Sequence, residues 1–140
     1  MASASTEQLA AVPLFSALTK PDLQQVLRAA DEIDVESGRE LVTEGRVGHE
    51  FFLILEGQAE VRRGGERVTT LGPDDYFGEL ALLDHGPRSA TVIAETEMKL
   101  LVLGQREFGG LVETVPGLAA KLLPGLARRL REVDASAFRY

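Results

Sequence analysis

The sequence predicts a mainly β domain with flanking helices, an α+β fold built around a small antiparallel β-roll or jelly roll. Three observations support this prediction: an amphipathic helical pattern near the N-terminus, a central region of short β-prone runs separated by glycines, and helical periodicity after Gly104. The 140 residues amount to one ordinary domain, 1–140. A hydrophobic fraction of 44% and a charged fraction of 26% are typical of a folded protein.

The N-terminal region is predicted to be helical. Apolar residues recur at helical spacing from Leu23 to Ala30, and Thr19 is a favourable N-cap ahead of Pro21. The polar first residues carry no such pattern. The predicted segments are a loose tail over residues 1–8 and N-terminal helices within residues 10–32, namely a short turn over 12–18 and a longer helix over 20–31.

Residues 33–104 are predicted to form the β-roll, because short β-prone runs alternate there with glycines. The pair Gly64-Gly65 suits a hairpin, since both central residues of a type I′ turn need positive φ. Seven or eight short strands joined by such turns are typical of a jelly roll of eight antiparallel strands. The predicted strands span residues 33–36, 40–43, 51–56, 59–63, 67–71, 89–95 and 99–103.

C-terminal helices are predicted over residues 105–140. Apolar residues return to helical spacing over 106–115 and again over 118–138. Pro124, followed by Gly125, interrupts the second stretch. Proline lacks a backbone donor and crowds the carbonyl four residues earlier, so a kink or a boundary between two helices is expected there.

Composition excludes several classes of function. Fifteen basic and 22 acidic side chains give a net charge of −7, which argues against direct binding to nucleic acid. Without cysteine there is no disulfide, thiolate metal site or Cys nucleophile. The termini carry no signal-peptide pattern and the apolar runs are too short for a membrane span, so a cytoplasmic protein without membrane contact is expected. His49 and His85 lie apart in glycine-flanked turns, so no metal site is expected.

One segment, residues 76–92, breaks the β pattern and carries the candidate chemistry. A short helix starting at Gly78 would present free N–H groups that favour an anion. Arg88 is the only basic residue between Arg67 and Lys99, and its planar fork suits a phosphate. The carboxylate of Glu79 suits ribose hydroxyls instead. A residue suited to a phosphate and a residue suited to a ribose, nine positions apart, indicate a cyclic nucleotide, whose phosphate and ribose lie close together.

The stretches Phe77-Gly78-Glu79-Leu80-Ala81-Leu82-Leu83 and Pro87-Arg88-Ser89-Ala90-Thr91-Val92 resemble the phosphate-binding cassette of cyclic nucleotide-binding domains. We assign this cassette to residues 77–92. The resemblance extends over nearly the whole chain. It includes Val12-Pro13-Leu14-Phe15, Glu44-Gly45, Gly48, Glu56-Gly57, Leu71-Gly72 and Leu126-Ala127-Arg128-Arg129-Leu130.

The resemblance implies a role for each matching residue. Glu79 would take the ribose 2′-hydroxyl, Arg88 would take the exocyclic phosphate oxygens, and Gly78 would start the cassette helix tightly. The serine that follows Arg88 favours cAMP, because a threonine at that place is linked to cGMP in the family; cGMP stays possible. The backbone N–H groups expected to complete the phosphate cradle belong to Leu80, Ala81, Ser89 and Ala90.

The implied function is that of a sensor or regulatory domain that binds a cyclic nucleotide, needs no cofactor and signals by rearranging its C-terminal helices. Closure over the base would fall to Leu130, Val133 or Asp134, where the predicted break at Pro124 would interfere. No catalytic constellation points to an enzyme, and a cupin-like metal enzyme is disfavoured. The alternatives are a protein-interaction or dimerisation module with a vestigial pocket, or a sensor fragment of a larger transcription regulator, kinase or channel. The partner would be a second copy through the C-terminal helix or an unknown effector protein.

Overall fold

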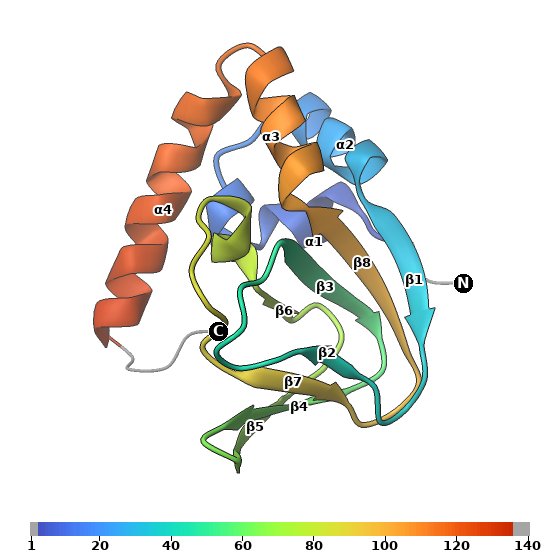
Figure 1. Cartoon of the computed structure of the whole chain (residues 1–140). Helices are drawn as coiled ribbons and strands as arrows, with labels where there is room; N and C mark the ends of the chain where they lie inside the picture. The colour runs from blue at the N-terminus through green and yellow to red at the C-terminus, as the bar shows by residue number, and fades with distance from the viewer. Residues whose placement is uncertain (1–2, 136–140) are drawn as a thin grey trace.

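The computed structural model describes residues 3–135, and their side chains as far as residue 131. Eight strands, all paired antiparallel, form two four-stranded sheets in the orders β1-β8-β3-β6 and β2-β7-β4-β5, which curve into a roll (Figure 1). This confirms the predicted β-roll with flanking helices. The strands are β1 (Asp31–Val35), β2 (Glu40–Val42), β3 (Glu50–Glu56), β4 (Ala59–Arg63), β5 (Glu66–Leu71), β6 (Tyr76–Phe77), β7 (Thr91–Ala94) and β8 (Met98–Gly104).

Strand β3 is buried on both faces, which explains its unbroken apolar run. Successive side chains of a strand point to opposite faces. Phe51, Leu53 and Leu55 therefore pack against the helices, whereas Phe52 and Ile54 pack between the two sheets. Strand β8 divides its side chains in the same way. These two central strands thus join the two apolar cores, one under the helices and one inside the roll.

The turn between β4 and β5 has the predicted form. Gly64 and Gly65 have φ of 60° and 81°, and the strand residues on either side pair with each other. The sequence did not reveal β6, because two residues are too short to show an alternating pattern. Tertiary contacts define this strand instead: Phe77 pairs with Phe52 of β3, and the two rings stack with their centroids 4.7 Å apart.

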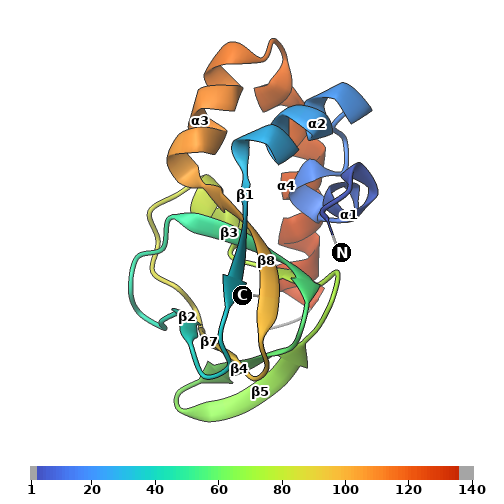
Figure 2. The same ribbon diagram turned by 90° about the vertical axis from the view of Figure 1, so that its right-hand side faces the viewer.

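Most helices gather at one end of the roll, and α4 runs down its side (Figures 1 and 2). The predicted cap of α2 is confirmed: Thr19 and Asp22 form a reciprocal capping box. The prediction of a loose tail through residue 8 is wrong for its last residues, because Ser5 caps helix α1 with a second capping box. The helices are α1 (Thr6–Ala10), the 3₁₀ helix η1 (Pro13–Phe15), α2 (Lys20–Ala29), the 3₁₀ helix η2 (Glu79–Leu82), α3 (Gln105–Thr114) and α4 (Leu118–Ala135).

Helix α4 continues through Pro124, so the predicted boundary between two helices is wrong. The reason is the contact that α4 makes with η1 next to the proline. A Cβ built on Gly125 would lie 2.1 Å from the carbonyl oxygen of Pro13 and 2.8 Å from Cα of Leu14. Glycine therefore lets two backbones touch, and this packing outweighs the local cost of a proline inside a helix, about 3 kcal/mol. The last predicted helical residues, 136–138, lie outside the described part.

Candidate functional site

A pocket of about 280 Å³ is lined by η2, by the loop that precedes β7, by Val42 of β2 and Val92 of β7, and by Arg129 of α4. The structure brings all seven residues predicted for the site into its lining: Gly78, Glu79, Leu80, Ala81, Arg88, Ser89 and Ala90. The lining also includes five other residues of the predicted cassette, Phe77, Asp84, Gly86, Pro87 and Val92, and two residues outside it, Val42 and Arg129.

Gly78 starts η2 in the left-handed conformation, with φ of 80°, which glycine adopts without strain. A side chain at this position would also have no room: a Cβ on Gly78 would lie 2.3 Å from Nη1 of Arg88 and 2.8 Å from the carbonyl oxygen of Glu50. The helix is a single 3₁₀ turn, and the N–H of Ala81 donates to the carbonyl of Gly78. The structure therefore differs from the expectation that this N–H faces a phosphate. Leu80 is partly exposed at the rim of the pocket.

Arg88 lies in a slot formed by two glycines. A Cβ on Gly48 would lie 1.8 Å from its Nε, and Gly78 closes the opposite side. Nη2 donates to the carbonyl oxygen of Glu50 at 2.7 Å and lies 3.7 Å from the carboxylate of that residue. The Cζ atom lies 6.0 Å from the ring centroid of Phe52. The guanidinium is thus held in one position, although the acidic partner itself is largely exposed.

The Nε atom of Arg88 is buried and has no hydrogen-bond partner among the described residues. Burial lowers the pKa of this guanidinium from its ordinary value, and the nearby carboxylate of Glu50 opposes that change. Arginine nevertheless remains charged at neutral pH. A buried cation with a donor left unsatisfied is costly, so this atom is the feature of the pocket that most directly indicates an anionic ligand.

Glu79 is 1% exposed and lines the pocket. Its Oε1 atom forms an ion pair with Nε of Arg129 on α4 at 3.0 Å. Its Oε2 atom accepts a hydrogen bond of 3.4 Å from the N–H of Leu14 in η1. A carboxylate has about four lone-pair sites and can accept from several donors at once. Glu79 therefore links the cassette to the N-terminal and C-terminal helices.

The residue of α4 that reaches the pocket is Arg129, which is 6% exposed. The predicted closing residue Leu130 is 66% exposed instead; the side chains of Val133 and Asp134 lie outside the described part. Arg129 was not among the residues expected to close over the base. Arg129 lies 50 residues after Glu79 in the sequence, and no sequence pattern connects the two before the fold brings them together.

Ser89 and Ala90 form a bend before β7, whereas the sequence predicted that the strand includes them.

The two histidines, predicted to be separate, have ring centroids 6.3 Å apart in an edge-to-face arrangement. No group of three or more His, Cys, Asp or Glu side chains in residues 3–131 is arranged to hold a metal ion. Within the described helices, none is both long enough and apolar enough to cross a membrane.

Residues 32–115 match the family model of the cyclic nucleotide-binding domain. The chain belongs to this family. The family is one of regulatory domains and not of catalysts. Its β-roll, its left-handed glycine and its buried cation are therefore parts of a nucleotide-binding fold.

Relatives and solved structures agree with this assignment. The chain is 42% identical over 106 residues to a cAMP-dependent protein kinase regulatory subunit of Yarrowia lipolytica, covering 74% of this chain and 28% of the relative. It is 34% identical over 127 residues to the cyclic AMP receptor protein of Thermus thermophilus, covering 87% and 59%. The N-terminal domain of a transcriptional regulator from Streptomyces coelicolor A3(2) superposes with a TM-score of 0.81 at 33% identity, covering 92% and 96%. The chain thus spans about a quarter of the kinase subunits that it matches.

Proposed function

We propose that this domain binds cAMP and acts as the sensing part of a regulatory protein. The observation that carries the proposal is the buried Nε of Arg88, which has no hydrogen-bond partner among the described residues, in a residue that lines the pocket. A phosphate oxygen is the acceptor that matches its charge and would complete its hydrogen bonding. The names of the kinase subunit and of the receptor protein support cAMP as the ligand.

The remaining roles are those that the resemblance to the family implies, and the residues concerned line the pocket. Glu79 accepts the ribose 2′-hydroxyl, and Gly78 leaves room for Arg88 beside it. The N–H groups of Leu80, Ser89 and Ala90 are the backbone donors that we assign to the phosphate. The side chain of Ser89 favours cAMP over cGMP, and the two ligands are compared directly in the test below.

We further propose that α4 reports the bound ligand. Its Arg129 is paired with the carboxylate that would accept the ribose hydroxyl. A ligand that shares Glu79 with Arg129 changes the strength of this ion pair and thereby the position of α4. Binding then shifts the population between two positions of the helix, by as much as the ligand's affinities for them differ. The contact of Glu79 with Leu14 gives the same ligand a connection to η1.

Calorimetric titration with cAMP and cGMP tests the proposal. We expect the wild type to bind cAMP more tightly than cGMP. Arg88→Ala should lose about 2–5 kcal/mol of binding free energy, since it removes the charged partner of the phosphate. Arg106→Ala, on the exposed surface of α3, is the matched control and should bind as the wild type does. Equal binding by Arg88→Ala would refute the phosphate role.

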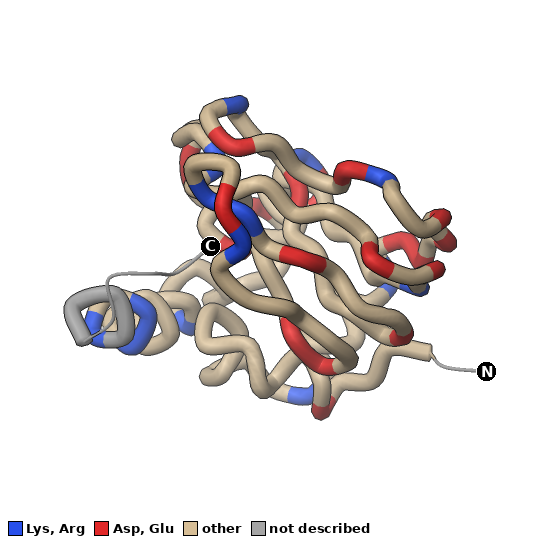
Figure 3. Tube along the Cα trace, turned by 90° about the horizontal axis from the view of Figure 1, so that it is seen from below, with Lys and Arg blue, Asp and Glu red and all other residues tan. Residues whose placement is uncertain are grey.

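A second copy of the chain is the partner that the exposed face of α4 favours. Leu123 and Leu130 are 63% and 66% exposed, and their spacing of seven residues, with Ala127 between them, is that of a helix seam. The described side chains of α4 include basic but no acidic groups, shown in blue in Figure 3. The sequence of the same helix continues with the acidic residues Glu132 and Asp134, so the apolar spacing is the argument for the seam. The mass measured by light scattering should shift toward the dimer at higher protein concentration. Leu130→Lys should abolish that shift.

A further inference from the structure

The segment Arg88–Ala90, here called the phosphate arm, carries the groups that we assign to the phosphate, yet it lies outside the strand ladders. Strand β7 begins only at Thr91. The direction of the arm's peptide groups is therefore set by individual hydrogen bonds to neighbouring elements. These bonds decide whether its N–H groups can meet a ligand.

Both backbone groups of Arg88 are bonded to the loop between β2 and β3. Its N–H donates to the carbonyl of Arg46 at 2.8 Å, and its carbonyl accepts from the N–H of Gly45 at 2.8 Å. The next carbonyl, that of Ser89, accepts from Nε of Arg63 at 3.0 Å. Two consecutive carbonyls of the arm are thus held by donors from other parts of the roll.

A trans peptide is planar, so the C=O of one residue and the N–H of the next point in opposite directions. When Gly45 holds the carbonyl of Arg88, it also fixes the direction of the N–H of Ser89. When Arg63 holds the carbonyl of Ser89, it fixes the direction of the N–H of Ala90 in the same way. Ser89 and Ala90 line the pocket, while the carbonyls are bonded to donors of β4 and the β2–β3 loop.

Arg63 is itself well placed for this task. It is the last residue of β4, immediately before the glycine turn, and it is half-buried. The N–H of Gly64 donates to Oε1 of Glu44 at 2.9 Å, and the N–H of Glu44 donates to Oγ1 of Thr91 at 2.9 Å. The hairpin that carries Arg63 is therefore tied to the strand that begins directly after the phosphate arm.

We propose that Arg63 is a positioning residue for the phosphate site: through the carbonyl of Ser89 it orients the N–H of Ala90 toward the ligand. It does not touch the ligand. This inference rests on the proposed binding of a cyclic nucleotide and adds to it a residue outside the cassette.

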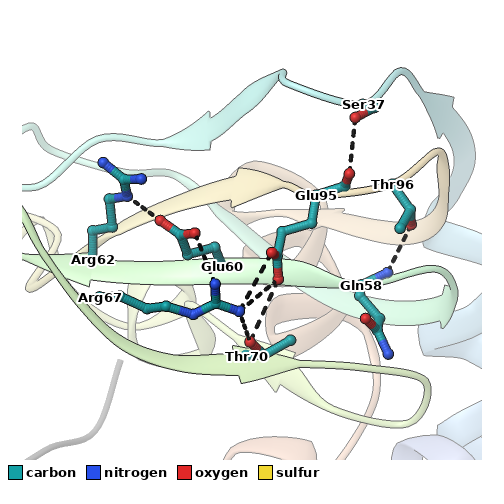
Figure 4. A network of polar contacts seen from close by, with 8 residues as sticks. All are labelled: Ser37, Gln58, Glu60, Arg62, Arg67, Thr70, Glu95 and Thr96. Atoms are coloured by element: carbon teal, nitrogen blue, oxygen red, sulfur yellow. Dashed lines mark hydrogen bonds and ion pairs between the residues drawn. The ribbon is translucent and has the colours of Figure 1, made fainter.

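The neighbouring Arg62 offers a matched control. Its guanidinium pairs with Glu60 on the outer side of the sheet, in the polar network of Figure 4. Arg62→Ala and Arg63→Ala remove the same side chain from adjacent strand positions, but only the second removes the bond to the carbonyl of Ser89. Arg63→Lys restores a cationic donor of nearly the same reach.

The test measures the backbone carbonyl ¹³C shift of Ser89 without ligand and the affinity for cAMP by calorimetry. Arg63→Ala should move the Ser89 shift and weaken cAMP binding by about 3- to 10-fold, the usual effect of one net hydrogen bond. Arg63→Lys should stay within about twofold of the wild type in affinity, because one comparable donor remains. Arg62→Ala should leave both the carbonyl shift and the affinity unchanged.

An unchanged Ser89 shift in Arg63→Ala would overturn the proposal, as would wild-type affinity in that variant. Equal losses in Arg62→Ala and Arg63→Ala would also overturn it, because the effect would then be one of general charge or strand stability. If the wild type itself binds neither cAMP nor cGMP, the proposed function fails, and the role of Arg63 in binding fails with it. The two failures can be told apart. If the proposed function fails, calorimetry detects no binding to the wild type, but the ligand-free carbonyl shift of Ser89 still reports whether Arg63 donates to that carbonyl.

Discussion

Replacing Gly48 by alanine should displace Arg88, although Gly48 is not itself a predicted ligand residue. The added Cβ would lie 1.8 Å from Nε and 2.2 Å from Cζ of Arg88. The guanidinium would have to move by roughly 1.7 Å to reach an ordinary contact of about 3.5 Å. Its bond of 2.7 Å to the carbonyl of Glu50 would be lost, together with its alignment toward the phosphate. We expect a loss of about 2–4 kcal/mol in cyclic nucleotide binding, or roughly 30- to 1,000-fold.

Calorimetry with cAMP measures this loss, and urea unfolding separates it from a loss of stability. The folded state loses one hydrogen bond of about 1 kcal/mol, and the smaller entropy of the unfolded alanine chain offsets roughly 0.4–1 kcal/mol of it. Stability should therefore change little. Gly72→Ala is the matched control, because a Cβ there meets nothing within 4 Å. If Gly48→Ala binds cAMP within about twofold of the wild type, Arg88 does not depend on its slot and the reasoning is refuted.

Two further predictions concern α4. Gly125→Ala should destabilise the protein by about 2–3 kcal/mol in urea unfolding, because its Cβ would meet the backbone of Pro13. Gly109→Ala in α3, which has open space around it, should stabilise the protein by about 0.5–1 kcal/mol. A change of the same sign at both sites would contradict this account. The hydrogen bond from Lys121 lowers the pKa of Asp22, so the bond stabilises the fold at neutral pH and is lost as the pH falls through that lowered pKa. The stability advantage of the wild type over Asp22→Asn should therefore shrink below about pH 3.9, which is the ordinary pKa of an aspartate side chain. An advantage that stays constant down to pH 2 would show that the ion pair contributes nothing to stability.

Much of the fold could be predicted because local patterns and tertiary structure agree. The glycine pair at residues 64–65 requires a turn with positive φ, and Thr19 followed by Asp22 defines the start of α2. The failures occurred where tertiary contacts override the local pattern. Pro124 predicted a kink or a boundary between two helices, but α4 runs through it as one helix, with Gly125 in close contact with η1.

The candidate site could be predicted only in its contiguous part. The cassette carries Glu79 and Arg88 in a readable order, and both line the pocket. Arg129 was not predicted to reach it, because its role depends on how α4 crosses the roll. Arg63 was missed for a similar reason: it acts on a backbone carbonyl 26 residues away, and no sequence pattern marks such a contact.

The side-chain Nε–H resonance of Arg88 in a ¹H–¹⁵N spectrum tests the central claim most directly, because this buried N–H has no hydrogen-bond partner in the described part of the structure. On titration with cAMP, we expect this resonance to move downfield and to become protected from exchange, as it would on donating to a phosphate oxygen. Adenosine, which lacks the phosphate, should leave the resonance in place. If cAMP binds and the Arg88 Nε–H resonance does not respond, the phosphate is held elsewhere and the account is contradicted.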